Sequence, residues 1–135
     1  MARLSDAEVS ALREKISPEV DRIAFFEGTE TPGCSPLNQE KRDGHYNCAV
    51  CGETLFTSAE KYESGSGWPS FWAPANEQAL GTKRDFKLLM PRTEFHCANC
   101  GAHGGHVFND GPQPTGLRYC VNGIVLDFEP QEGED

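Results

Sequence analysis

Four of the six cysteines in this 135-residue chain form two copies of one motif. The motif, Cys-x-x-Cys-Gly, occurs at residues 48–52 and again at residues 97–101. Tetrahedral Zn²⁺ prefers soft ligands, and a Cys-x-x-Cys turn presents two thiolates on one side. The glycine after each pair suits a tight turn. We therefore predict one structural zinc ion, Zn²⁺, with four ligands, Cys48, Cys51, Cys97 and Cys100.

The two pairs are further apart than in a usual zinc ribbon. A metal would therefore clamp two distant hairpins and close a long loop, where a crosslink contributes most to stability. The alternative is that one pair is a redox dithiol, as in thioredoxin, but that function requires a βαβ context, which this Gly-rich region lacks. Four thiolates leave no open coordination position, so we expect no catalysis at the metal.

A fifth cysteine, Cys120, lies in a run of residues that is typical of a strand. Side chains alternate along a strand, so Arg118, Cys120 and Asn122 would share one face while Tyr119 and Val121 pack on the other. A basic, a nucleophilic and an amide side chain on one face indicate a reactive site. Free cysteine is also often a small buried hydrophobe, and spacing alone leaves both interpretations open.

Two histidines, in His103-Gly-Gly-His106, favour the reactive interpretation. On a flexible loop, two imidazoles three residues apart can converge on one site as acid, base or ligands. The alternatives are metal ligation near Cys100 or two surface histidines. Four thiolates already complete a tetrahedral site, which weakens the metal alternative. His45 and His96 stand alone, and we assign them no role.

Two short helices are expected before these motifs. Ser5 and Glu8 have capping-box spacing, and Ser17-Pro18 begins a second helix. We divide the single domain into a helical arm (1–27), a mobile connection (28–44), a β core (45–128) and a frayed acidic tail (129–135).

Short β-like runs follow the connection, separated by turn residues, and indicate an α+β domain that is mainly β. The expected strands are His45–Asn47, Thr54–Thr57, Thr82–Leu89, Thr93–His96, His106–Asn109, Leu117–Asn122 and Ile124–Phe128.

Composition narrows the possible functions. The formal net charge of −9 argues against nucleic-acid binding, which relies on basic residues that neutralise phosphates. No run approaches the roughly 18 apolar residues of a membrane span, and the N-terminus lacks the apolar stretch of a secretory signal. We therefore expect a cytoplasmic protein without a membrane partner, in which cysteines serve metal or redox chemistry.

Several segments together resemble the methionine sulfoxide reductase B family, and the two Cys-x-x-Cys-Gly motifs resemble its zinc-bearing members. The resemblance extends, in order, from about Gly28 to Phe128. The segments are Gly65-Ser-Gly-Trp-Pro-Ser-Phe71, Arg92-Thr-Glu94, His103-Gly-Gly-His-Val-Phe108 and Gly116-Leu-Arg-Tyr-Cys-Val-Asn122.

The resemblance implies two antiparallel β-sheets with helices on the N-terminal side. It also implies reduction of the R epimer of methionine sulfoxide, mainly in oxidised proteins and peptides. Cys120 is then the nucleophile and ends as a sulfenic acid, while the histidines protonate the departing oxygen. The implied catalytic residues are Cys120, His103, His106 and Asn122, and the implied substrate-binding residues are Trp68, Arg118 and Phe108.

The chain departs from this family at two places. Many members have a resolving cysteine where this chain has Ser66, and Cys34 is the only thiol left for that role. We hypothesise a Cys34–Cys120 disulfide that thioredoxin reduces; the alternative is an incidental loop cysteine and direct reduction by an external thiol. Lys87-Leu-Leu89 replaces a common Ser-His-Gly segment, which puts in doubt any substrate contact made by that histidine.

Three other functions compete with the reductase. A zinc-dependent binding module would need neither Cys120 nor the histidine pair. A zinc-ribbon nucleic-acid binder conflicts with the acidic charge. A redox sensor that uses Cys34 and Cys120 explains neither the histidines nor the Trp68 segment.

Overall fold

The computed structural model describes residues 3–26, 36–85 and 92–131. Two helices, α1 (Asp6–Arg13) and α2 (Pro18–Phe26), precede a set of short strands and 3₁₀ turns. The strands are β1 (Gly44–Cys48), β2 (Thr54–Thr57), β3 (Lys61–Tyr62), β4 (Ser70–Phe71), β5 (Leu80–Asp85), β6 (Arg92–Cys97), β7 (His103–Phe108), β8 (Arg118–Val121) and β9 (Leu126–Pro130). The 3₁₀ turns are η1 (Pro36–Gln39), η2 (Ser58–Glu60) and η3 (Gly123–Val125).

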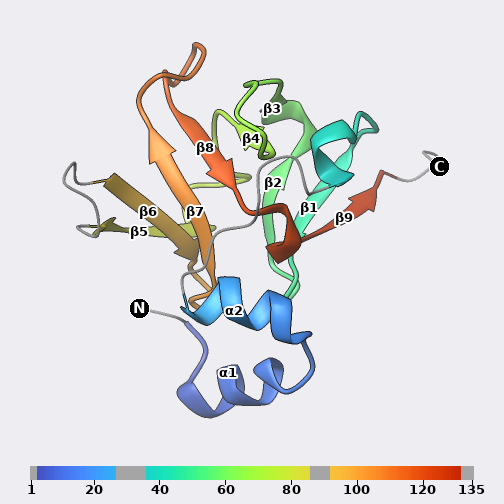
Figure 1. Cartoon of the computed structure of the whole chain (residues 1–135), viewed down its shortest axis with the longest axis vertical. Coiled ribbons are helices and arrows are strands. Elements are labelled where there is room, and N and C mark those ends of the chain that lie inside the picture. The colour runs from blue at the N-terminus through green and yellow to red at the C-terminus, as the bar shows by residue number, and fades with distance from the viewer. Residues whose placement is uncertain (1–2, 27–35, 86–91, 132–135) are drawn as a thin grey trace.

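The strands form two antiparallel sheets, which confirms the predicted fold class. One sheet has the order β2-β1-β9, and the other has the order β3-β4-β8-β7-β6-β5. Both helices lie at one end of the sheets, as Figure 1 shows, and α2 packs against β7 and η3. Neither helix in the described residues has the length and apolar character needed to cross a membrane.

The N-terminal helices begin where their capping signals predict. Ser5 is the N-cap of α1; its hydroxyl accepts from the Glu8 amide, and its own amide donates to the Glu8 carboxylate at 3.0 Å. Pro18 is the first residue of α2, and Ile23 and Ala24 of that helix are buried in the core. The helical arm is thus attached to the β structure through an apolar stripe.

Aromatic side chains fill the space between the two sheets. Phe56 of the smaller sheet stacks on Phe71 of the larger at a centroid distance of 4.3 Å, and it also meets Phe95 and Tyr119 edge-on. Tyr46 completes the cluster from β1. Because Tyr119 faces this core, its neighbour Cys120 is directed to the opposite face of the larger sheet.

Several sequence predictions differ from the structure. The segment His103–His106, expected to be a loop, belongs to β7. The two-residue strands β3 and β4 were not predicted, because a run of two residues has no readable periodicity. Glu129 and Pro130, expected in a frayed tail, pair with β1. The end of the expected strand Thr82–Leu89 lies outside the described residues.

Candidate functional site

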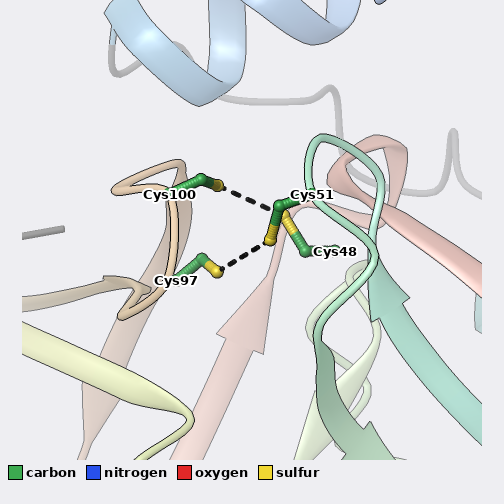
Figure 2. Close-up of side chains that lie close together, drawn as sticks. All are labelled: Cys48, Cys51, Cys97 and Cys100. Carbon is green, nitrogen blue, oxygen red and sulfur yellow. Dashed lines mark hydrogen bonds between the residues drawn. The ribbon is translucent and has the colours of Figure 1, made fainter. Parts of the chain in front are cut away.

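The two Cys-x-x-Cys-Gly motifs form turns of the same construction. Cys48 is the last residue of β1 and Cys51 lies in the β1–β2 turn; likewise, Cys97 is the last residue of β6 and Cys100 lies in the β6–β7 turn. In each turn the glycine has a positive φ, 86° at Gly52 and 83° at Gly101, and its amide donates to the carbonyl of the first cysteine at 2.8 Å. Figure 2 shows the four side chains turned toward one another across the gap between the hairpins.

The geometry of this cluster fits a tetrahedral zinc ion. The Sγ atoms of Cys48 and Cys100 are 3.7 Å apart, those of Cys51 and Cys97 are 3.6 Å apart, and all four lie within 4.8 Å of one another. A Zn–S bond of about 2.3 Å requires about 3.8 Å between sulfurs at tetrahedral angles. These separations are much too long for disulfides. The cluster is therefore a candidate metal site.

A separate group of reactive side chains lies on β7 and β8. Cys120 is directly opposite His106 across the two strands, so both side chains point to the same face of the sheet. This face carries a cavity of about 260 Å³. The cavity is lined by Ser66, Trp68, Gly105, His106, Phe108, Arg118, Cys120 and Asn122.

Close approach of the backbones at Gly105 makes this arrangement possible. A Cβ at residue 105 would lie 1.9 Å from the carbonyl oxygen of Cys120. The Asn122 amide nitrogen and its side-chain Nδ2 both donate to the Gly104 carbonyl, at 2.9 and 3.2 Å. Gly105 therefore lets β8 approach β7, and the two hydrogen bonds to the Gly104 carbonyl hold Asn122 at the edge of the cavity.

A β-bulge explains how two histidines three residues apart come together. Phe95 pairs with Gly105 and His96 pairs with His103, so Gly104 is an additional residue in β7. In a regular strand, residues three apart point to opposite faces. The bulge puts both imidazoles on one side, with centroids 5.6 Å apart. His103 is only 4% exposed and does not line the cavity, whereas His106 does.

Arg118 is held over the cavity by two contacts. Its guanidinium forms a bidentate pair with Asp110 at 2.8 and 3.2 Å, and it lies 4.3 Å from the centroid of the Phe108 ring. The guanidinium holds the pKa of Asp110 below its usual range. A fixed positive charge thus stands two residues from Cys120 on the same face.

A chain of hydroxyl groups reaches the sulfur of Cys120 from the other side. The Ser64 hydroxyl bonds to Ser70 at 2.7 Å and to Ser66 at 2.8 Å, and the Ser66 Oγ is 3.8 Å from the Cys120 Sγ. Burial raises the pKa of the Cys120 thiol, while Ser66 and Arg118 act in the opposite direction. Burial is the largest of these effects, so Cys120 rests as a thiol at neutral pH.

The structure brings together most of the residues singled out in the sequence. Cys120, His106, Asn122 and Arg118 line one cavity, and Trp68 and Phe108 supply its aromatic walls. His103 stands behind His106 rather than on the wall. Cys34 and Lys87–Leu89 lie outside the described residues.

Comparison with known proteins gives a consistent result. Residues 16–130 match the model of the SelR domain. The chain is 48% identical to the peptide methionine sulfoxide reductase MsrB of Pseudomonas putida (strain W619) over 128 residues, which covers 95% of this chain and 96% of the relative. It is also 48% identical to the protein of that name from Hahella chejuensis, over 90% of this chain and 88% of the relative. The chain belongs to the SelR (MsrB) family.

Family membership agrees with the resemblance read from the sequence motifs. A third relative, the MsrB of Thioalkalivibrio sulfidiphilus, is 48% identical over 88% of this chain and 87% of its own length. The cavity on β7 and β8 is therefore the candidate active site of an MsrB-family chain.

Sequence reasoning missed part of the surroundings of this MsrB-family site. Ser64 and Ser70 orient Ser66, and the hydroxyl spacing in residues 64–70 was a readable signal for a turn held by side chains. Strand pairing places Glu94 opposite His106 and Lys83 opposite Glu94. A single sequence does not show which residues strand pairing will place opposite one another.

Proposed function

We propose that this chain reduces the R epimer of methionine sulfoxide in proteins and peptides to methionine, with Cys120 as the nucleophile. The observation that carries the proposal is the shared cavity in which Cys120 directly faces His106. The relatives are named peptide methionine sulfoxide reductases, which supports the reaction. The R epimer is expected from the family resemblance of the sequence motifs.

The cavity suits a small sulfoxide group. Trp68 and Phe108 provide apolar surface for the methyl and methylene groups next to the sulfur. His106, Arg118 and Asn122 provide the polar atoms on which the oxygen can be held. An apolar wall on one side and polar groups on the other distinguish the methyl group from the oxygen, which is the requirement for choosing one epimer.

The reaction needs a proton at the sulfoxide oxygen, because O²⁻ is not a feasible leaving group. We assign that proton to His106, which lines the cavity, with His103 behind it. The Cys120 thiolate attacks, the sulfur–oxygen bond of the substrate breaks, and the oxygen moves to Cys120. The substrate sulfur gains two electrons, Cys120 loses two, and the products are methionine and a Cys120 sulfenic acid.

The resting thiol must lose its proton before it attacks. Burial raises the pKa of Cys120, and the Ser66 hydroxyl and the Arg118 guanidinium offset part of that effect. The opposed imidazole of His106 is a receiver for this proton and can then pass it to the oxygen. One proton is thus moved from sulfur to oxygen within the cavity. A thiol at rest also protects Cys120 from adventitious oxidation between turnovers.

We further propose that Cys34 resolves the sulfenic acid and that thioredoxin reduces the resulting disulfide. Attack by the Cys34 thiol forms the sulfur–sulfur bond and releases water. Asn38 donates to the Gly67 carbonyl at 3.0 Å, beside Ser66 and the reactive sulfur. Cys34 precedes Asn38 by four residues in the sequence, which supports its choice as the resolving thiol.

Mass spectrometry after substoichiometric sulfoxide tests the recycling step. A peptide pair linked through Cys34 and Cys120 is the expected product, and a stable sulfenic acid without that linkage would contradict it. Ser66→Cys in a Cys34→Ser background is a matched control. The introduced thiol would stand where the Ser66 hydroxyl now lies, 3.8 Å from the Cys120 sulfur, so a disulfide is expected there.

We propose zinc as the occupant of the cysteine cluster. The four thiols would hold it as thiolates, and its chemistry there is to join the β1–β2 and β6–β7 turns. Four thiolates whose sulfurs lie within 4.8 Å of one another repel each other, so a cation is needed to keep all four ionised together. The metal would take no part in the sulfoxide reaction, which we place in the separate cavity. We regard both sites as parts of a single domain.

Turnover of separated R and S epimers of a methionine-sulfoxide peptide, with dithiothreitol as reductant, tests the proposed function. We expect wild-type protein to reduce the R epimer and Cys120→Ser to reduce neither. Zinc content and thermal unfolding should be the same in both proteins. Absence of turnover by folded, zinc-loaded wild type would contradict the proposal.

A further inference from the structure

A single transverse row of side chains crosses the six-stranded sheet through the candidate active site. Strand pairing places six residues in one line across the sheet, each directly opposite the next. Their order is Tyr62, Ser70, Cys120, His106, Glu94 and Lys83. Directly paired residues point to the same face. The row therefore continues beyond Cys120 and His106 to a carboxylate and an ammonium group.

Glu94 is the most unusual member of this row, because its carboxyl group is buried. The residue is 2% exposed, and its Oε1 lies 3.3 Å from the Lys83 Nζ and 3.8 Å from the His103 Nδ1. A buried carboxylate is unfavourable unless it is paired. The Lys83 side chain is 56% exposed, so water screens its charge strongly. Glu94 therefore keeps much of its attraction for a second cation.

His103 is the group that can become that cation. Its Nδ1 lies 3.8 Å from the Glu94 carboxylate, and its ring is 5.6 Å from that of His106 in an edge-on arrangement. It is buried and does not reach the cavity wall, so its direct contact with substrate is limited. A buried carboxylate thus adjoins both imidazoles, and the outer imidazole of His106 faces the nucleophile.

We propose that Glu94, anchored by Lys83, is a positioning residue that acts as the counter-ion of the histidine pair and stabilises the proton that the pair carries during catalysis. The inference rests on the proposed function for the direction in which that proton moves. The inference goes beyond the proposed function because it gives a role to Glu94 and Lys83, which do not line the cavity. When the Cys120 proton arrives on the pair, the carboxylate stabilises the positive charge until the sulfoxide oxygen accepts the proton.

Other charged groups around the pair do not replace Glu94. His96, opposite His103, has no negatively charged form near neutral pH and so cannot serve as a counter-ion. The buried residues that α2 contributes here are apolar, Ile23 and Ala24. On β8, Cys120 faces His106, and the charge of Arg118 is paired with Asp110.

The test compares the pH dependence of kcat for a methionine-(R)-sulfoxide peptide in Glu94→Gln and Lys83→Met. Loss of the carboxylate should move the high-pH fall in kcat to lower pH by about one unit, the size expected for an opposite charge within about 4–6 Å. Loss of the Lys83 ammonium should move the high-pH fall in kcat to higher pH, because the Glu94 carboxylate then acts on His103 alone. Glu129→Gln, on the other sheet, and Arg84→Met, next to Lys83 in β5, are matched controls that should leave the profile in place.

A purely structural role predicts a different pattern. In that case Glu94→Gln would lower kcat equally at every pH, or both variants would shift the profile in the same direction, and either result would overturn the proposal. Glu94→Asp keeps the charge and should retain the wild-type position of the high-pH fall. If Glu94→Gln does not fold, the surface variant Lys83→Met decides through the direction of its shift.

Histidine ring signals, followed by ¹⁵N NMR across the pH range, separate this proposal from the proposed function. We expect the imidazole of His103 to lose its proton at lower pH in Glu94→Gln than in wild type. If neither epimer is reduced but this difference is present, the reductase proposal fails and the counter-ion role stands. If the peptide is reduced and the ring signals are identical in the two proteins, the counter-ion role fails.

Discussion

The cysteine cluster and the Cys120 cavity are both built on the β6–β7 hairpin, but they use it differently. Cys97 ends β6 and Cys100 lies in the turn that follows, whereas Glu94, His103 and His106 lie in the strands behind that turn. The cluster combines four identical side chains and needs only equal distances between their sulfurs. The cavity combines different side chains, each with one task, and depends on which residues the strands pair. The cluster therefore depends on the fold that brings the two turns together, and the cavity depends on the register of the paired strands.

The largest expected effect is on the cluster. Cys97→Ser removes one ligand of the proposed zinc ion and should lower the free energy of unfolding by about 4 kcal/mol or more, as loss of a structural metal does. Zinc content and thermal unfolding measure it. Cys120→Ser, which removes a thiol from the cavity, is the control and should change neither. A zinc-free Cys97→Ser protein with wild-type stability would contradict the structural role of the cluster.

The next largest effect is expected in the cavity and not in the cluster. His106→Asn removes the proposed acid but keeps a polar side chain, and it should lower kcat for the R epimer by about 10²- to 10⁴-fold. Zinc content and unfolding should be unchanged, because His106 lies on the cavity wall. A kcat within a few-fold of wild type would remove His106 from the reaction.

Arg118→Met tests how charge tunes the nucleophile. Arg118 lowers the pKa of Cys120 against the larger effect of burial, so its loss should raise that pKa further. At a fixed pH below the pKa, less thiolate is present, and alkylation of Cys120 by iodoacetamide should slow by about tenfold for one pKa unit. The rate should recover only at higher pH. Identical pH profiles for variant and wild type would show that the guanidinium serves packing on Phe108 alone.

The smallest expected effect is that of Ser66→Ala. The hydroxyl lowers the pKa of Cys120 through a single contact with its sulfur, whereas Arg118 lowers that pKa in two ways, through its charge and through a side-chain hydrogen bond. Alkylation at neutral pH should slow by about threefold. A change as large as that of Arg118→Met, measured in the same assay, would reverse this ranking.

The cysteine cluster could be predicted from the sequence more completely than the Cys120 cavity. The cluster could be predicted because each half is a local motif, and local geometry decides where the two thiols of a turn point. The common face of Arg118, Cys120 and Asn122 followed from strand alternation. The identity of the site as a whole came from the family resemblance, since spacing alone left Cys120 undecided between nucleophile and packed side chain.

The histidine pair and its surroundings required the structure. The bulge at Gly104 arises from pairing with β6, and nothing in His103-Gly-Gly-His106 by itself distinguishes a bulged strand from a loop. Glu94 and Lys83 are placed by the same pairing. Long-range register depends on how whole strands pack, so a single sequence does not reveal it.

The most direct measurement is one turnover of Cys34→Ser protein with a methionine-(R)-sulfoxide peptide in the presence of dimedone, which traps sulfenic acids. We expect one equivalent of reduced peptide and one dimedone adduct on Cys120, with the four cluster cysteines unmodified. Reduced peptide formed without an adduct on Cys120, or with the adduct on another cysteine, would contradict the assignment of the chemistry to this cavity.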